Sequence, residues 1–494
     1  MKYRPRLSWP AGKLQARKFQ IDGMDINPET ITSTDKSEPR LPGELWRKII
    51  GFTIRLAGAN AIELEDPFST PYINEEYPEV DPGLFADRKT ISLVNSSWNA
   101  AVREIAAEYL VIYSNKQLAF LAQKFEADKP KLTDAVPVQL HKRLKNAKNA
   151  PHAGRGTTAY ANPLKRLGEW TTRVDFKILG PYSIPLVLRL LRCLPNLRIY
   201  CNKNGPFDIP ERPMPFEVID DLITHNSHSL RRLEWAGAGE APRYADLVHL
   251  CNCLPHLTTL RLVAIHSYPT VKTMAPPLLV LPRLKNLSLG VIPETQKHRA
   301  HYFITWDPFV RLLCQNPDIQ IPSLKRLDCD IFPQHTMPFF YLHGHKLRFF
   351  RTTAWSVEEA LADVLDNCPN LETLVISQGA EKVSIPWFHP TLRQICITPT
   401  TDVVVGVPQK VFDYAVMAPL DSLLKQIETM IAPCLVELRI RNMGAYLNLC
   451  EYSTWLRFWW IRWSIRGVQF LDKTGVSYQN IQDPNEALLN LVRC

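Results

Sequence analysis

One phrase recurs along most of the chain: an apolar run, often a proline, then a leucine with further apolar residues three and five positions later. Its versions include CLPNLRIY, CLPHLTTLRL, VLPRLKNLSL, CPNLETLVI and APCLVELRI, whereas HSLRRLEW and HKLRFFRTT lack the proline. The leucines that begin these phrases are Leu197, Leu230, Leu257, Leu284, Leu324, Leu347, Leu371, Leu392 and Leu435. Their separations are 33, 27, 27, 40, 23, 24, 21 and 43 residues, which predicts an array of stacked repeats.

The repeat phrase predicts a short strand that follows a helix. Apolar residues of the phrase alternate with polar ones, so the apolar side chains point inward and the polar ones lie on the opposite face. Upstream, SVEEALADVLDNC predicts a helix, and the proline after such a helix ends it. Its apolar face is formed by Val357, Ala360, Leu361, Val364 and Leu365. No unit buries its apolar face alone, so the expected fold is an α/β solenoid, an irregular leucine-rich-repeat horseshoe over residues 110–450 with a polar concave strand face.

A separate helical module is predicted nearer the N-terminus, beginning with LPGELWRKII at residues 41–50. Pro42 suits the first helical position, because its missing N–H would have no partner there. The apolar stripe through Leu45 and Ile49 needs a cover, which residues 84–110 can supply as two further helices, with N-cap candidates in NSS. Three short helices make a core that is marginal by itself, so we expect their remaining apolar face to bind a partner.

The two segments LPGELWRKII and ISLVNSSWNAAVRE together resemble the F-box. That pattern begins with Leu-Pro, runs through an apolar helix and closes on Leu-Val-(Cys/Asn)-x-x-Trp. The resemblance covers residues 41–109, and YLVIYSNKQLAFLAQKF is similar to the segment after the box in many fungal F-box proteins. The chain departs from the pattern through an acidic, proline-containing insertion at about residues 57–83, which we expect to be a surface loop.

The resemblance implies a partner and a set of contact residues. An F-box binds the Skp adaptor of a cullin-RING ubiquitin ligase. Carried over to this chain, the contacting residues are Leu41, Pro42, Leu45, Ile49, Leu93, Val94 and Trp98. The alternative is that these residues only build a three-helix cap on the repeats, since apolar stripes at helical spacing are usually core.

Three segments fall outside the repeats. Residues 1–40 are expected to be a disordered N-terminal segment. The basic stretch at about residues 127–163 is expected to be an exposed loop. A run of charges such as its HKRLKNAK is usually solvated, and the alternative is a contact for acidic partners or a nuclear import signal. Residues 451–494 are expected to seal the last repeat as a C-terminal cap. The alternative for their tryptophans and arginines is a surface for a partner.

Chemistry-bearing motifs are missing from the sequence. It has no GxxxxGK[ST], GxGxxG, HExxH or GxSxG, and its CNC at residues 251–253 and HGH at residues 343–345 lack the second pair that a zinc site needs. We therefore expect no catalytic residues, no cofactor, no metal and no enzymatic activity. The scattered eleven cysteines favour reduced thiols in the cytoplasm or nucleus. Neither a secretory signal nor a membrane-spanning apolar run is present.

These observations lead to one functional hypothesis and two alternatives. The hypothesis is a substrate-recognition adaptor of a Skp–cullin–F-box type ubiquitin ligase, with an unknown target protein held by the repeats. The first alternative is a protein-binding scaffold without a ligase role. The second is a nucleic-acid-associated protein, which the net charge of +9 permits without requiring it.

Overall fold

The computed structural model describes most of the chain from Pro42 onward. The described residues are 42–69, 82–128, 166–203, 212–235, 240–262, 265, 278–290, 307–329, 336–353, 360–378, 383–399, 409–441, 452–472 and 474–478. The chain divides into two compact units, Met1–Trp46 and Arg47–Cys494. The expectations for residues 1–40 and for nearly all of the basic stretch lie outside the described residues.

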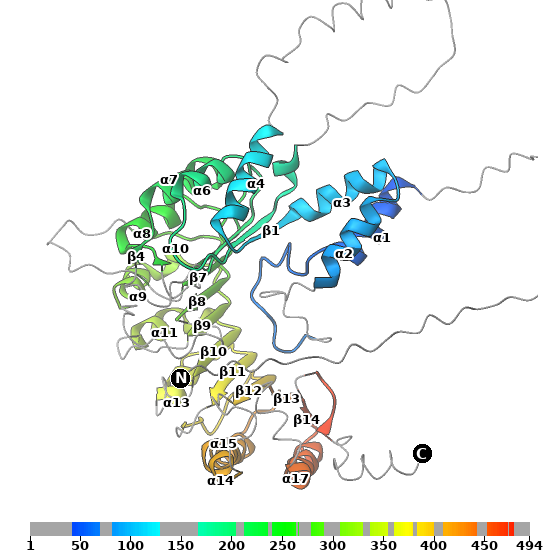
Figure 1. The fold of residues 1–494 in the computed structure, drawn as a ribbon. Coiled ribbons are helices and arrows are strands. Elements are labelled where there is room, and N and C mark those ends of the chain that lie inside the picture. Colours follow the sequence, from blue (N-terminus) through cyan, green and yellow to red (C-terminus); the bar gives the residue numbers. More distant parts are fainter. Residues whose placement is uncertain are drawn as a thin grey trace, which may run out of the picture. The chain divides into compact units, whose positions relative to one another are not determined.

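A parallel sheet of 12 strands dominates the second unit (Figure 1). Each strand is hydrogen-bonded to the preceding and following strands of the sheet in chain order. In order, the strands are β1 (Tyr109–Ile112), β2 (Arg173–Phe176), β3 (Ile199–Asn202), β5 (Arg232–Trp235), β7 (Thr259–Leu262), β8 (Asn286–Leu289), β9 (Arg326–Cys329), β10 (Phe349–Thr353), β11 (Thr373–Gln378), β12 (Gln394–Pro399), β13 (Glu437–Ile440) and β14 (Gln469–Leu471). A separate two-stranded sheet pairs β4 (Arg212–Pro213) with β6 (Glu240–Ala241).

Helices connect most of these strands, as parallel pairing requires. Those between β1 and β9 are α4 (Asn115–Ala127), η3 (Leu167–Trp170), α6 (Ile184–Leu191), α7 (Phe216–Asn226), α8 (Tyr244–Asn252), α9 (Asp307–Leu313) and α10 (Pro317–Gln320). Later ones are α11 (Met337–His343), η5 (Gly344–Lys346), α13 (Ala360–Asp366), α14 (Gln409–Phe412), η6 (Asp413–Met417), α15 (Ala418–Thr429) and α17 (Ser453–Ile465). No helix in the described part of the chain combines the length and the apolar character that crossing a membrane requires.

The recurring phrase sets the register of the sheet. Each of its nine leading leucines is buried and stands two residues before a strand, from β3 to β13. The apolar residue three positions after each leucine lies in one row across the sheet, where Leu233, Leu260 and Leu287 are successive partners. This row and the apolar sides of the helices share one large core. The prediction of strands at these phrases is therefore confirmed.

Two strands of the sheet lie in segments without the complete phrase. LVIYSNKQLAFLAQKF forms β1 and then α4, and WTTRVDFKI contains β2. In the C-terminal segment, β14 pairs with β13 and is the last strand of the sheet. Before it, α17 buries Leu456, Trp459 and Trp463.

Candidate interaction surfaces

A small helical cluster precedes the sheet. It is formed by α1 (Gly43–Ile54), α2 (Pro82–Ser92) and α3 (Ser96–Glu108). In the part that begins at Arg47, Ile50 and Ile54 share a small core with Val102 and Ile105, separate from the large core of the sheet. Arg88 also donates two hydrogen bonds to the Ile54 carbonyl, at 3.2 and 3.0 Å.

Several large apolar side chains of this cluster point into solvent. Ile49 is 45% exposed, Phe52 92% and Phe85 60%. Leu93 and Val94, in the turn between α2 and α3, are 76% and 55% exposed. The turn is fixed by the N-cap of α3, where the Asn95 side chain accepts a hydrogen bond from the Trp98 amide at 2.8 Å. Exposed apolar side chains gathered on one small element are typical of an interaction surface.

The structure places six of the seven residues carried over from the F-box resemblance. Ile49, Leu93 and Val94 are exposed, whereas Trp98 is half-buried against the small core. In the first unit, Pro42 is exposed and Leu45 is 41% exposed. Leu41 lies outside the described residues.

As far as residue 69, the insertion after α1 is a loop without helix or strand, and part of it is buried against the sheet. Residues 55–69, here named the crossing segment, run across the strand face that points away from the helices. Carbonyl groups of this segment accept hydrogen bonds from arginines of four strands. The bonds run from Arg173 Nη1 to Gly58 (2.8 Å), Arg232 Nη1 to Ala61 and Glu63 (3.0 Å each), Arg326 Nη1 to Glu65 (2.7 Å) and Arg439 Nη1 to Pro67 (3.1 Å).

Apolar side chains hold the crossing segment at its two ends. At the first end, Leu56 and Ala59 pack with Tyr109 and Val111 of β1. At the other, Phe68 is 9% exposed and packs in a cluster with residues of three strands. Those residues are Phe349 of β10, Val375 of β11 and Cys396 of β12. The segment therefore crosses the sheet in chain order, from β1 to β13.

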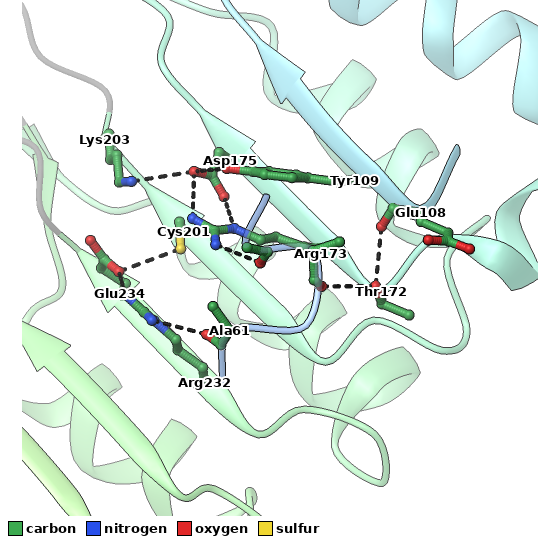
Figure 2. Close-up of polar contacts among 12 residues, drawn as sticks. Ala61, Glu108, Tyr109, Thr172, Arg173, Asp175, Cys201, Lys203, Arg232 and Glu234 are labelled. Carbon is green, nitrogen blue, oxygen red and sulfur yellow. Dashed lines mark hydrogen bonds and ion pairs between the residues drawn. The ribbon is translucent and has the colours of Figure 1, made fainter. Parts of the chain in front are cut away.

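The charged residues of the strand face from β2 to β9 are buried, whereas polar residues nearer its C-terminal edge, such as Gln394 and Glu437, are half-buried. Figure 2 shows the network beneath the first part of the crossing segment. Arg173 and Asp175 are both fully buried, with 2.8 Å between Nε and Oδ1. Asp175 Oδ2 also accepts from Lys203 at 3.2 Å and from the Tyr109 hydroxyl at 2.8 Å.

Charge pairing outweighs burial in setting the ionisation of this network. Burial alone would raise the pKa of Asp175, but Lys203 and Arg173 lower it well below its ordinary value. Burial likewise opposes ionisation of Glu234, whose pKa is nevertheless lowered by Lys203, Arg232 and Arg261. Both carboxylates therefore stay ionised beneath the crossing segment.

The same arrangement occurs on four strands of the sheet, β2, β5, β9 and β13. Each arginine that donates to the crossing segment also pairs with an acid two positions away on its own strand, an alternation that places both on one face. The pairs are Arg173–Asp175, Arg232–Glu234, Arg326–Asp328 and Arg439–Glu437, at 2.8, 2.7, 2.8 and 2.6 Å. Sequence reasoning missed this site, although the recurring Arg-x-(Asp/Glu) in RVD, RLE and RLD was a signal for it.

A polar cavity of about 380 Å³ lies beside the start of the crossing segment. Its walls include Arg55, Glu108, Trp170 and Arg198. Arg55 donates to Glu108 at 2.7 Å, so these two charges neutralise each other. The cavity gives no sign of a particular ligand.

The two short Cys and His pairs lie at the ends of helices that precede strands of the large sheet, α8 and α11. Burial raises the pKa of Cys251 to about 12, which keeps this thiol protonated. His343 is fully buried, and its Nε2 donates to the Leu313 carbonyl at 3.0 Å. Its Nδ1 therefore accepts from the Lys346 ammonium, 3.1 Å away. Within the described ranges, no three His, Cys, Asp or Glu side chains gather as a metal site.

His343 predicts a pH dependence of stability. Burial lowers its pKa to about 4, so the native state excludes a proton that the unfolded chain binds below a pKa of about 6.5. The stability that neutral His343 provides is present above about pH 6.5 and is lost as the pH falls toward 4, by roughly 1–3 kcal/mol. We expect His343→Gln, which keeps a donor for Leu313, to show a shallower loss in urea unfolding between pH 7 and 4. Equal pH profiles for the two proteins would contradict this.

No protein-family model matches the chain, and no curated protein matches it.

Proposed function

We propose that the chain is a substrate-recognition adaptor of a Skp–cullin–F-box type ubiquitin ligase. In this proposal the helical cluster is an F-box-like module that binds the Skp adaptor, and the parallel sheet with its helices is a leucine-rich-repeat solenoid that presents a target protein. The function is proximity: a tethered target has a high effective concentration near the charged ubiquitin carrier. The chain itself performs no bond chemistry.

One observation carries the proposal: the cluster keeps a core of its own and still exposes Ile49, Phe52, Leu93 and Val94. A module folded only to support the repeats would gain stability by burying such residues. Their exposure supports a second protein as their cover. Among the described cysteines none forms a disulfide, which agrees with a cytoplasmic or nuclear location.

The turn between α2 and α3 gives a direct test. We expect Leu93→Asp/Val94→Asp to weaken capture of the purified Skp adaptor by the full chain at least about 100-fold, since two charges would be desolvated in an apolar contact. Affinity is measured by biolayer interferometry. Both side chains are largely exposed, so the thermal unfolding midpoint should stay within a few degrees of wild type.

A matched control lies outside the cluster. Phe120 on α4 is 60% exposed, and Phe120→Asp should leave adaptor capture unchanged. Wild-type affinity in the Leu93→Asp/Val94→Asp chain would show that this turn is not the contact. Failure of the wild-type chain to capture the adaptor would refute the proposal as a whole.

A scaffold without a ligase role is the second candidate, because the cluster is also tied to the sheet. Glu108 at the end of α3 pairs with Arg55, and the chain passes directly from α3 into β1. Arg47 lies 4.1 Å above the ring of Trp170, in the segment before β2. These contacts favour a cap on the first repeat. If that is the whole role, the chain captures no adaptor, and the exposed turn serves another partner.

A further inference from the structure

The strand face recognises the crossing segment mainly through its backbone. Each of four arginines is oriented by a carboxylate of its own strand and directs Nη1 to carbonyl oxygens of the segment. Because every residue type supplies a carbonyl, these contacts do not depend on the side chains of the bound segment. The donors are already held in position by buried ion pairs, and this preorganisation lowers the entropy that binding an extended chain would cost.

The positive charge of the strand face and the contact of Arg439 with Phe68 determine which kind of peptide the face prefers. Basic residues exceed acidic ones on the face, where Arg173, Lys203, Arg232, Arg261, Arg326, Arg351, Arg439 and Arg441 accompany Asp175, Glu234, Asp328 and Glu437. The crossing segment is acidic through Glu63, Glu65 and Asp66. Glu65 Oε1 lies 2.7 Å from Arg441 Nη2, and the Arg439 guanidinium is 5.3 Å from the centre of the Phe68 ring.

We propose that this strand face is a binding site for an extended acidic peptide with an aromatic residue near its C-terminal end, and that residues 55–69 occupy it as an internal ligand. A peptide of another protein with this chemistry reaches the arginines only when the crossing segment leaves. The proposal goes beyond the adaptor role and holds whether or not the helical cluster binds a Skp adaptor. It means that the strand face binds acidic peptides and that the crossing segment competes with them for this face.

The first test exchanges the internal ligand for one added in solution. In the full chain, residues 56–69 are replaced by a glycine-serine sequence of equal length. The probe is a fluorescein-labelled peptide with the sequence of residues 55–69, RLAGANAIELEDPFS. By fluorescence anisotropy we expect the replaced chain to bind this peptide at least about tenfold more tightly than wild type does, because a tethered competitor acts at about millimolar effective concentration.

Matched variants test the mode of recognition. Arg326 holds Asp328 with Nε and Nη2 while Nη1 serves the crossing segment, so Arg326→Lys keeps the charge and loses the fork. In the replaced chain it should weaken peptide binding by about tenfold. A peptide with Phe68→Ala, or one with Glu63→Gln and Glu65→Gln, should bind about three- to tenfold more weakly.

A second variant covers the case in which the replaced chain does not fold. Phe68→Ala in the full chain keeps the carbonyl contacts and removes one anchor, so it should bind the wild-type peptide more tightly than the unaltered chain does. Folding is checked by circular dichroism. The proposal is overturned if a folded replaced chain, or a folded Phe68→Ala chain, does not bind the peptide more tightly than wild type. A neutral effect of Arg326→Lys would overturn it as well. Skp-adaptor capture, measured separately, reports on the adaptor proposal alone.

Discussion

Arg173→Leu is expected to lower the free energy of unfolding by about 3–5 kcal/mol at pH 7, because it leaves the carboxylate of Asp175 buried without its closest cationic partner. The two side chains are fully buried, and Arg173 donates to both carboxylate oxygens, at 2.8 and 3.1 Å. The substitution also removes the hydrogen bond to the Gly58 carbonyl. Urea unfolding followed by tryptophan fluorescence measures the loss.

The size of this loss should depend on pH in a defined direction. In the native state the pKa of Asp175 is lowered, so its contribution to wild-type stability is present above its unfolded pKa of about 3.9 and is lost as the pH falls below it. In Arg173→Leu, burial favours the neutral form of the Asp175 carboxyl group. The variant protein therefore loses the unfavourable buried charge when this group is protonated in acid. The difference between the two proteins should therefore shrink from pH 7 to pH 4.

Two further variants distinguish the destabilisation caused by an unpaired buried charge from that caused by the loss of a contact. Arg173→Leu/Asp175→Leu removes both charges and should regain at least about half of the stability that Arg173→Leu loses. Arg348 and Glu372 form an exposed pair at 3.0 Å, and Arg348→Leu should cost less than about 1 kcal/mol. An Arg173→Leu penalty as small as that of Arg348→Leu, or one that does not change with pH, would contradict the argument.

The sequence predicted the parts of the fold that local pattern determines. A leucine followed by alternating apolar residues has one way to bury its side chains in a strand, so the positions of nine strands could be predicted from their leading leucines. β14 was missed, because QFL in a segment rich in tryptophan and arginine lacks the leading Leu-x-x-Leu phrase. The exposed Leu93 and Val94 came from a family resemblance and not from periodicity.

The crossing segment could not be predicted in the same way. Its contacts join residues more than 100 positions apart, as between Gly58 and Arg173 or between Pro67 and Arg439. Most of its bonds use backbone carbonyls, which leave no side-chain pattern in the sequence. An acidic segment with proline reads locally as a solvated loop, and only the basic strand face makes its burial favourable. The recurring Arg-x-(Asp/Glu) on separate strands was the available sign.

A glycine between two strands of the large sheet provides a second large expected effect. Gly344 stands five residues before β10, and buried leucines stand at the same distance before β3, β7 and β8, namely Leu194, Leu254 and Leu281. A methyl group at Gly344 would lie 2.3 Å from the carbonyl oxygen of Asn367, which precedes β11. Gly168 stands at the corresponding position before β2, and a methyl group there would lie 1.9 Å from the Cys193 carbonyl oxygen. At these two positions the backbone that precedes the next strand takes the place of the leucine side chain.

A side chain placed at Gly344 should therefore destabilise the protein. We expect Gly344→Ala to lower the free energy of unfolding by about 1–3 kcal/mol and Gly344→Leu by about 3 kcal/mol or more, since rigid backbone, not a flexible side chain, must move. Gly51 in α1 is the control: a methyl group there meets only the Arg55 side chain at 3.6 Å, so Gly51→Ala should stabilise by about 0.5–1 kcal/mol. Thermal and urea unfolding of the three variants decide the matter. A Gly344→Leu protein as stable as wild type would mean that the backbone around Asn367 moves to accommodate the side chain.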